Sequence, residues 1–129
     1  MKSMTIKDTY PIQAMEICKD EAKFATTDEI IAYLKESIEN HPVAVYIDIF
    51  DHYTHTKNLP EHSMDEKIID VKIIIFCFGK ELPVPQMAAV RPRSIAVVEE
   101  ADKFTLTFMD APNPVAHEAM TNWVKGVRK

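Results

Sequence analysis

The organisation of this chain follows from residues 43–56, which read Val-Ala-Val-Tyr-Ile-Asp-Ile-Phe-Asp-His-Tyr-Thr-His-Thr. The first eight positions repeat with the period of a β-strand, and a cluster of titratable side chains follows without a break. The predicted strand has a core face formed by Val43, Val45, Ile47 and Ile49. Its other face is formed by Ala44, Tyr46, Asp48 and Phe50. We therefore expect the strand to belong to the structural framework and the residues that directly follow it to form a functional site.

The composition indicates one globular domain over residues 1–129, of which 47% are apolar. This length can bury a core without a disulfide or a metal, and Cys18 and Cys77 suit reduced thiols. A net charge of −5 argues against nucleic-acid binding, which needs a basic surface. No apolar run approaches the about 20 residues of a membrane span, and residues 1–10 are too polar for a signal peptide. We expect a cytoplasmic protein.

Local patterns predict the remaining elements. Thr26 and Glu29 form a capping box that opens a helix ending at Asn40, and Asn113 with Pro114 opens a closing helix. Strands are expected at residues 10–19, 43–50, 68–78, 94–99 and 103–109, and residues 1–9 read as a flexible arm. The order β-α-β-β-β-β-α predicts an α+β domain of two layers, with a largely antiparallel sheet and two helices on one face.

Residues 27–114 resemble a bacterial family, the domain of unknown function 302. The resemblance lies in Asp28-Glu-Ile-Ile-Ala-Tyr-Leu-Lys35, the Asp51-His52 pair, Phe76-Cys-Phe-Gly79, Arg93-Ser-Ile-Ala-Val-Val-Glu-Glu100 and Phe108-Met-Asp-Ala-Pro112. It implies a β-α-β4-α arrangement similar to TATA-binding-protein-like folds. It implies no reaction, because the family has no assigned activity.

The connection after the first central strand holds three of the five histidines, His52, His55 and His62. If residues 51–57 form a helical turn, His52 and His55 share one face and could bind a divalent metal, with His62, Asp51 or Asp48 as third ligand. A plainer interpretation has Asp51 capping the turn while His52 makes an internal hydrogen bond. A third makes His52 an acid/base catalyst oriented by Asp51 or Asp48.

Two further features could bind a ligand. A pocket between the sheet and the closing helix is expected to be lined by Tyr46, Asp48, His52, Phe76, Phe78 and Trp123. Arg91 and Arg93 place two fixed positive charges at a strand entry, where they could bind a carboxylate or phosphate or pair with surface acids.

The function we expect from these features is the binding of a small molecule or a metal ion, with the site in residues 51–55. The alternative is a small enzyme that uses His52 with Asp51 or Asp48. A second alternative is a homodimeric structural protein, because the strand at residues 68–78 is apolar on both faces and both need cover.

Overall fold

The computed structural model describes residues 1–79 and 81–129. Over these residues the chain forms the following elements in order: β1 (Lys2–Ile6), β2 (Tyr10–Cys18), the 3-10 helix η1 (Lys19–Glu21), α1 (Thr27–Glu39), β3 (Ala44–Asp51), α2 (His52–Lys57), β4 (Asp70–Phe78), the 3-10 helix η2 (Pro85–Val90), β5 (Arg93–Glu99), β6 (Lys103–Met109) and α3 (Pro114–Lys125). In this part of the chain no helix is both long and apolar enough to cross a membrane.

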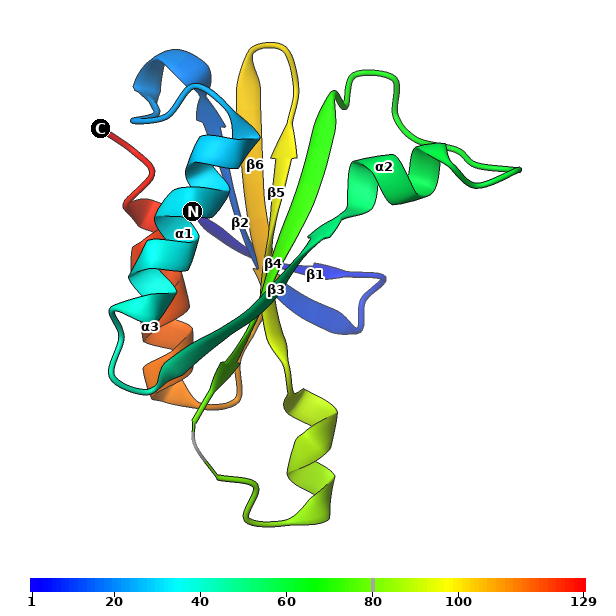
Figure 1. Ribbon diagram of the computed structural model, residues 1–129. Coiled ribbons are helices and arrows are strands. Elements are labelled where there is room, and N and C mark those ends of the chain that lie inside the picture. The colour runs from blue at the N-terminus through cyan, green and yellow to red at the C-terminus, as the bar shows by residue number, and fades with distance from the viewer. Residues whose placement is uncertain (80) are drawn as a thin grey trace.

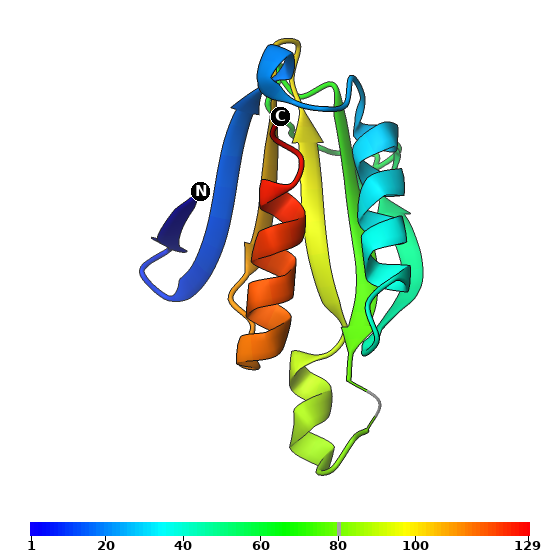
Figure 2. The ribbon, with the colours of Figure 1, turned by 90° about the vertical axis from the view of Figure 1, so that its left-hand side faces the viewer.

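The strands form one antiparallel sheet in the order β1-β2-β6-β5-β4-β3. Figure 2 shows α1 and α3 side by side over one face of this sheet, and Figure 1 shows α2 on the other side. This confirms the two-layer α+β fold with two helices on one face. The expectation of a flexible arm was wrong, because Lys2–Ile6 pairs with β2 as an edge strand and so gains a full ladder of backbone hydrogen bonds.

The core lies between the helices and the sheet. α1 contributes Ile30, Ile31, Leu34 and Ile38, as their helical spacing predicts, and α3 contributes Ala116, Met120 and Val124. The central strands contribute every second residue, including Phe76, Ile95 and Leu106, which are fully buried. Each strand therefore has one face toward the helices and one away from them.

The strand β3 does not keep the single alternation that its sequence suggests. A bulge lies between Tyr46 and Asp48, so the pairing with β4 shifts by one residue. Ala44 and Tyr46 face the core before the bulge and Ile49 after it, whereas Val45 and Ile47 are 52% and 51% exposed. The predicted core face was therefore wrong for Val45 and Ile47.

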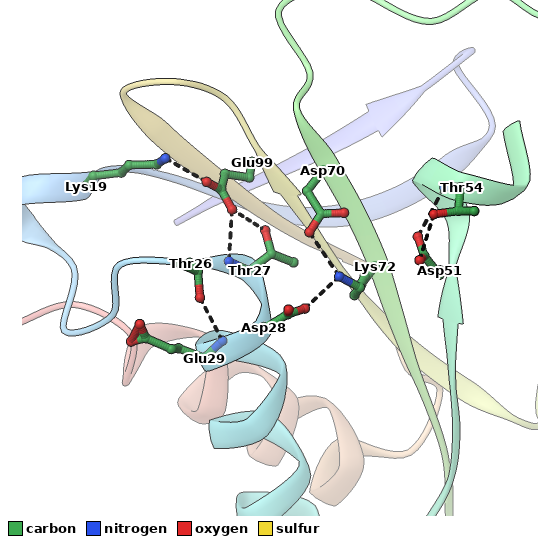
Figure 3. A network of polar contacts seen from close by, with 10 residues as sticks. All are labelled: Lys19, Thr26, Thr27, Asp28, Glu29, Asp51, Thr54, Asp70, Lys72 and Glu99. Atoms are coloured by element: carbon green, nitrogen blue, oxygen red, sulfur yellow. Dashed lines mark hydrogen bonds and ion pairs between the residues drawn. The ribbon is translucent and has the colours of Figure 1, made fainter. Parts of the chain in front are cut away.

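The end of β5 anchors the start of α1, as Figure 3 shows. Glu99 is buried, and its carboxylate accepts hydrogen bonds from the backbone N–H and hydroxyl of Thr27 at 2.9 and 2.8 Å. Its other oxygen lies 2.7 Å from Nζ of Lys19. The predicted cap is also present, because Thr26 accepts a hydrogen bond from the Glu29 N–H.

Candidate functional site

The segment after β3 forms the predicted helical turn, α2. Asp51 caps it, because its two carboxylate oxygens accept from the N–H and the hydroxyl of Thr54 at 3.1 and 2.8 Å. These bonds lower the pKa of Asp51. His52 forms its internal hydrogen bond with the Thr56 hydroxyl, whose oxygen lies 2.9 Å from Nδ1. The capping interpretation is confirmed.

The structure does not assemble an acid/base pair at His52. The Asp51 carboxylate accepts from the N–H of Thr54, and the Asp48 carboxylate accepts from the N–H of Ile49 at 2.8 Å. Neither acid is hydrogen-bonded to the imidazole, whose Nδ1 faces Thr56. A catalytic role for His52 thus has no orienting carboxylate in this conformation.

The three histidines do not converge as metal ligands. His52 and His55 both pack on the Phe50 ring, with their own ring centroids 6.4 Å apart. His62 instead lies beside the Leu59 carbonyl. Among the described residues, the group of three whose ligand atoms lie within 4.8 Å of one another is Cys18, Asp20 and Glu21, and all are exposed. Such exposed acidic groups are common without a metal.

The pocket expected from Tyr46, Asp48, His52, Phe76, Phe78 and Trp123 is not formed, because these residues lie on two faces of the sheet. Trp123 packs edge to face on Phe76 and on His41, and the Phe78 ring lies tilted against both Trp123 and His41. Asp48 lies opposite Ile75 on the other face, since the bulge in β3 reverses its direction. The aromatic residues therefore fill the core and line no common site with His52.

A cavity of about 170 Å³ lies where β4 ends, β5 begins and α3 begins; we call it the α3 cavity. Its apolar lining consists of Phe78, Met87, Val90, Ala111, Pro112 and Ala116. Its polar lining consists of Arg91, Arg93 and Asn113. A hollow of about 480 Å³ adjoins it and shares Val90, Arg93, Ala111 and Pro112. Of the predicted site residues, Phe78, Arg91 and Arg93 meet here.

Arg93 lies between the cavity and the hollow. It is the first residue of β5 and turns to the helix-covered face, where one Nη donates to the Met109 carbonyl at 2.5 Å. Its Nε is buried and has no hydrogen-bond partner among the residues that the structure describes. Burial lowers the pKa of Arg93, although the negative charge of Asp110 acts in the opposite direction. Arg93 is thus a partly desolvated cation with an unused donor.

Neither arginine forms an ion pair within residues 1–79 and 81–129. Asp110, which attracts Arg93 from a distance, instead accepts a hydrogen bond from the buried Gln13 amide at 3.0 Å. Arg91 donates to the Glu81 carbonyl, and its Nη2 lies only 3.1 Å from where a side chain on Gly79 would begin. Gly79 has a φ of 109°, which favours glycine, so Arg91 can lie against the backbone.

Sequence reasoning found the two arginines but not the residues that surround them. Asn113 was recognised only as a helix cap, which it is, because it accepts from the Val115 N–H at 2.9 Å. No local sequence pattern could identify Gln13, because its partner Asp110 lies 97 positions away in the chain. His117, which accepts from the Ala111 N–H at 3.2 Å and so holds the cavity wall, was also missed.

Comparison with known proteins places the chain in a family and gives no activity. No curated protein and no solved structure matches the chain. The resemblance to the domain of unknown function 302 and to TATA-binding-protein-like folds therefore stays a prediction. The family model for the family of unknown function DUF6858 matches residues 1–129, and the chain belongs to that family.

Proposed function

We propose that this protein binds a small organic anion in the α3 cavity, with Arg93 as the anchoring cation. The observation that carries the proposal is the Nε–H of Arg93, a buried donor without a hydrogen-bond partner in residues 1–79 and 81–129. Buried charges are normally paired, because taking an ion out of water without a partner is costly. An anion in the cavity supplies the acceptor that the protein does not.

The surroundings of Arg93 favour an anion over other ligands. The described lining of the α3 cavity adds a second guanidinium, that of Arg91, and includes no carboxylate. Mainly apolar walls lower the local dielectric, which strengthens the attraction between a guanidinium and an anion. The same lining residues include no imidazole or thiol. For this reason the proposed function is binding rather than catalysis.

The test is a titration followed by ¹⁵N NMR, with sodium benzoate and phenyl phosphate as the two probes. The Nε–H signals of arginines are resolved from the backbone, so Arg93 reports directly. We expect at least one probe to shift the Arg93 Nε–H signal together with the backbone amides of Ala111 and Ala116. Arg93→Gln should weaken the binding about tenfold or more, because a hydrogen bond to a charged group contributes about 1.5–3 kcal/mol.

Two further variants make this test specific. Arg128→Gln removes a guanidinium at the other end of α3, where Arg128 pairs with Glu21, and should leave the probe affinity unchanged. Ala116→Leu fills the cavity without altering its charge and should abolish binding while the protein stays folded by circular dichroism. If neither probe moves the Arg93 signal at millimolar concentration, the proposal is wrong.

A second candidate function is self-association through the sheet face opposite α1 and α3, outside the part where α2 contacts β4 (Figure 1). On this face Met4 is 45% exposed, Val45 52% and Met109 51%, and the half-buried Ile73 and Ile75 lie between the outer strands. Exposed apolar patches of this kind mark contacts with other protein surfaces. This supports the homodimer that the two-sided strand β4 suggests.

Sedimentation velocity over a range of protein concentrations tests this second candidate. We expect a dimer whose population rises with concentration and is lost in a Val45→Lys, Met109→Lys variant, since two charges on the face oppose its burial. Both positions are half exposed, so the variant should keep its fold. A wild-type protein that remains monomeric at the highest concentration would exclude it.

A further inference from the structure

The charged hydrogen-bond donors of the α3 cavity belong to two guanidinium groups, and each group already has one carbonyl partner. Nη2 of Arg93 donates a hydrogen bond to the Met109 carbonyl, and Nη1 of Arg91 donates one to the Glu81 carbonyl. At Arg93 the buried donor without a partner among the described residues is Nε–H, and a charge-assisted hydrogen bond from it suits a carboxylate oxygen. A phosphate ester has three acceptor oxygens and about two charges, so it needs more donors and more positive charge than a carboxylate does.

The start of α3 does not supply these donors. Phosphates bind at helix starts because the first backbone N–H groups there are free. Here Pro114 has no N–H, and the N–H of Val115 is taken by the Asn113 side chain at 2.9 Å. The next turn is already bonded, because the N–H of His117 donates to the Asn113 carbonyl at 3.0 Å. The helix start therefore leaves one N–H without an acceptor among the described residues, that of Ala116, whereas a phosphate site at a helix start uses several.

The negative charge beside the cavity also disfavours a dianion. Asp110 lines the hollow on the other side of Arg93 and is held there by Gln13. Its carboxylate partly offsets the positive charge of Arg93, and it repels any second charge on a ligand. The described lining of both spaces includes no lysine that could compensate.

The size and walls of the α3 cavity limit the rest of the ligand. A volume of about 170 Å³ is close to the cavity of roughly 150 Å³ that accepts benzene in another protein. The walls away from the arginines are apolar and come from β4, η2 and α3 through Phe78, Met87 and Ala116. They suit a compact apolar group of about ring size, whose burial contributes to binding in proportion to its area.

We infer that the ligand of the α3 cavity is a monocarboxylate with a compact apolar body, bound with its carboxylate on the Nε–H of Arg93 and its body against Phe78, Met87 and Ala116. This inference rests on the proposed function and specifies the chemical class of its ligand. The inference distinguishes the cavity from a site that binds phosphate and from a surface that binds any anion.

The test compares four probes on the wild-type protein at constant ionic strength: sodium benzoate, sodium acetate, phenyl phosphate and benzyl alcohol. We expect benzoate to bind about tenfold or more tightly than acetate, since acetate leaves the apolar walls empty. Benzoate should also bind about tenfold or more tightly than phenyl phosphate, whose second charge Asp110 repels, and than benzyl alcohol, which has no charge to pair with Arg93.

The outcomes distinguish the inference from the proposed function. Phenyl phosphate binding as tightly as benzoate, with the Arg93 Nε–H signal shifted, would overturn the carboxylate inference while anion binding stands. Acetate equal to benzoate would show that the apolar walls take no part and would overturn it as well. Benzyl alcohol equal to benzoate would remove the role of charge and overturn both, as would no binding by any probe.

Discussion

The strand β5 carries one charged residue at each end, and the two have opposite surroundings. Both Arg93 and Glu99 turn to the helix-covered face, and each lies where a helix begins. The carboxylate of Glu99 is paired with Lys19 and receives two hydrogen bonds from Thr27 (Figure 3). Arg93 has one hydrogen bond to a carbonyl, no ion pair among the described residues, and a buried Nε without a partner.

The difference separates a charge that maintains the fold from one that is available to a ligand. Glu99 joins β5, α1 and the segment after β2, and every partner belongs to the chain itself. Arg93 contacts a cavity instead, and the nearest acid, Asp110, is held by Gln13. Pairing within the chain offsets the desolvation of a buried ion, and an unpaired one retains the capacity to bind.

Replacing Glu99 by Gln has the largest expected effect on stability. The amide cannot neutralise Lys19, and it leaves donors of α1 poorly satisfied. Because hydrogen bonds to charged groups contribute about 1.5–3 kcal/mol each, we expect the free energy of unfolding to fall by about 2–3 kcal/mol. Urea denaturation followed by Trp123 fluorescence measures it. Glu16→Gln, which removes an exposed partner of Lys103, should cost under about 0.5 kcal/mol and is the control.

The contribution of the Glu99 carboxylate can also be tested through the pH dependence of stability, where the expected effect is smaller. Burial raises the pKa of Glu99, but the hydrogen bonds from Lys19 and Thr27 outweigh it and lower the pKa overall. A carboxyl whose pKa is lower in the folded state stabilises the fold above its unfolded pKa, and this is lost as the pH falls through the folded pKa. The stability difference between wild type and Glu99→Gln should therefore shrink below about pH 4. Parallel pH profiles would contradict this.

The sequence predicts the parts of the fold that depend on neighbouring residues. Thr26 with Glu29 and Asn113 with Pro114 each mark a helix start, because the cap and the N–H it accepts from are two or three residues apart. Asp51 was identified as a cap for the same reason. Such local hydrogen bonds form whatever the rest of the chain does, so a short pattern suffices to predict them.

The sequence does not predict features that depend on distant partners. No residue pattern in the sequence marks the bulge at residue 47. The bulge turns the Asp48 side chain to the other face of the sheet, so the pocket expected from Tyr46, Asp48 and His52 does not form. Likewise Arg93 could be recognised as a candidate, but its missing partner could not. That depends on the hydrogen bond between Gln13 and Asp110, which are 97 positions apart, and on the packing of the start of α3 beside β4 and β5.

Replacing Arg93 by Met should change the free energy of unfolding by less than about 1 kcal/mol. The substitution loses one hydrogen bond to Met109, but it also removes a half-buried charge that forms no ion pair with a described residue, and the flexible Met side chain fills the space. The same urea experiment measures it. A loss as large as that of Glu99→Gln would make Arg93 a structural charge and would remove the contrast between the two ends of β5.

The smallest expected effect is at Asp110, and it has the opposite sign to that of Arg93→Gln. Asp110→Asn keeps an acceptor for Gln13 but removes the negative charge near Arg93. We expect the affinity for benzoate to rise about two- to fivefold at low salt, and the gain to shrink as salt screens the interaction between the two charges.

Titration of both proteins with benzoate at two salt concentrations measures this change. Asp102→Asn, in the exposed turn at the other end of the sheet, is the matched control and should leave the affinity as it is. If Asp110→Asn weakens binding instead, Asp110 orients Arg93 rather than opposing the ligand. Arg93 would then have Asp110 as a partner within the chain, as Glu99 has Lys19. The two ends of β5 would differ only in how far each charge lies from its partner.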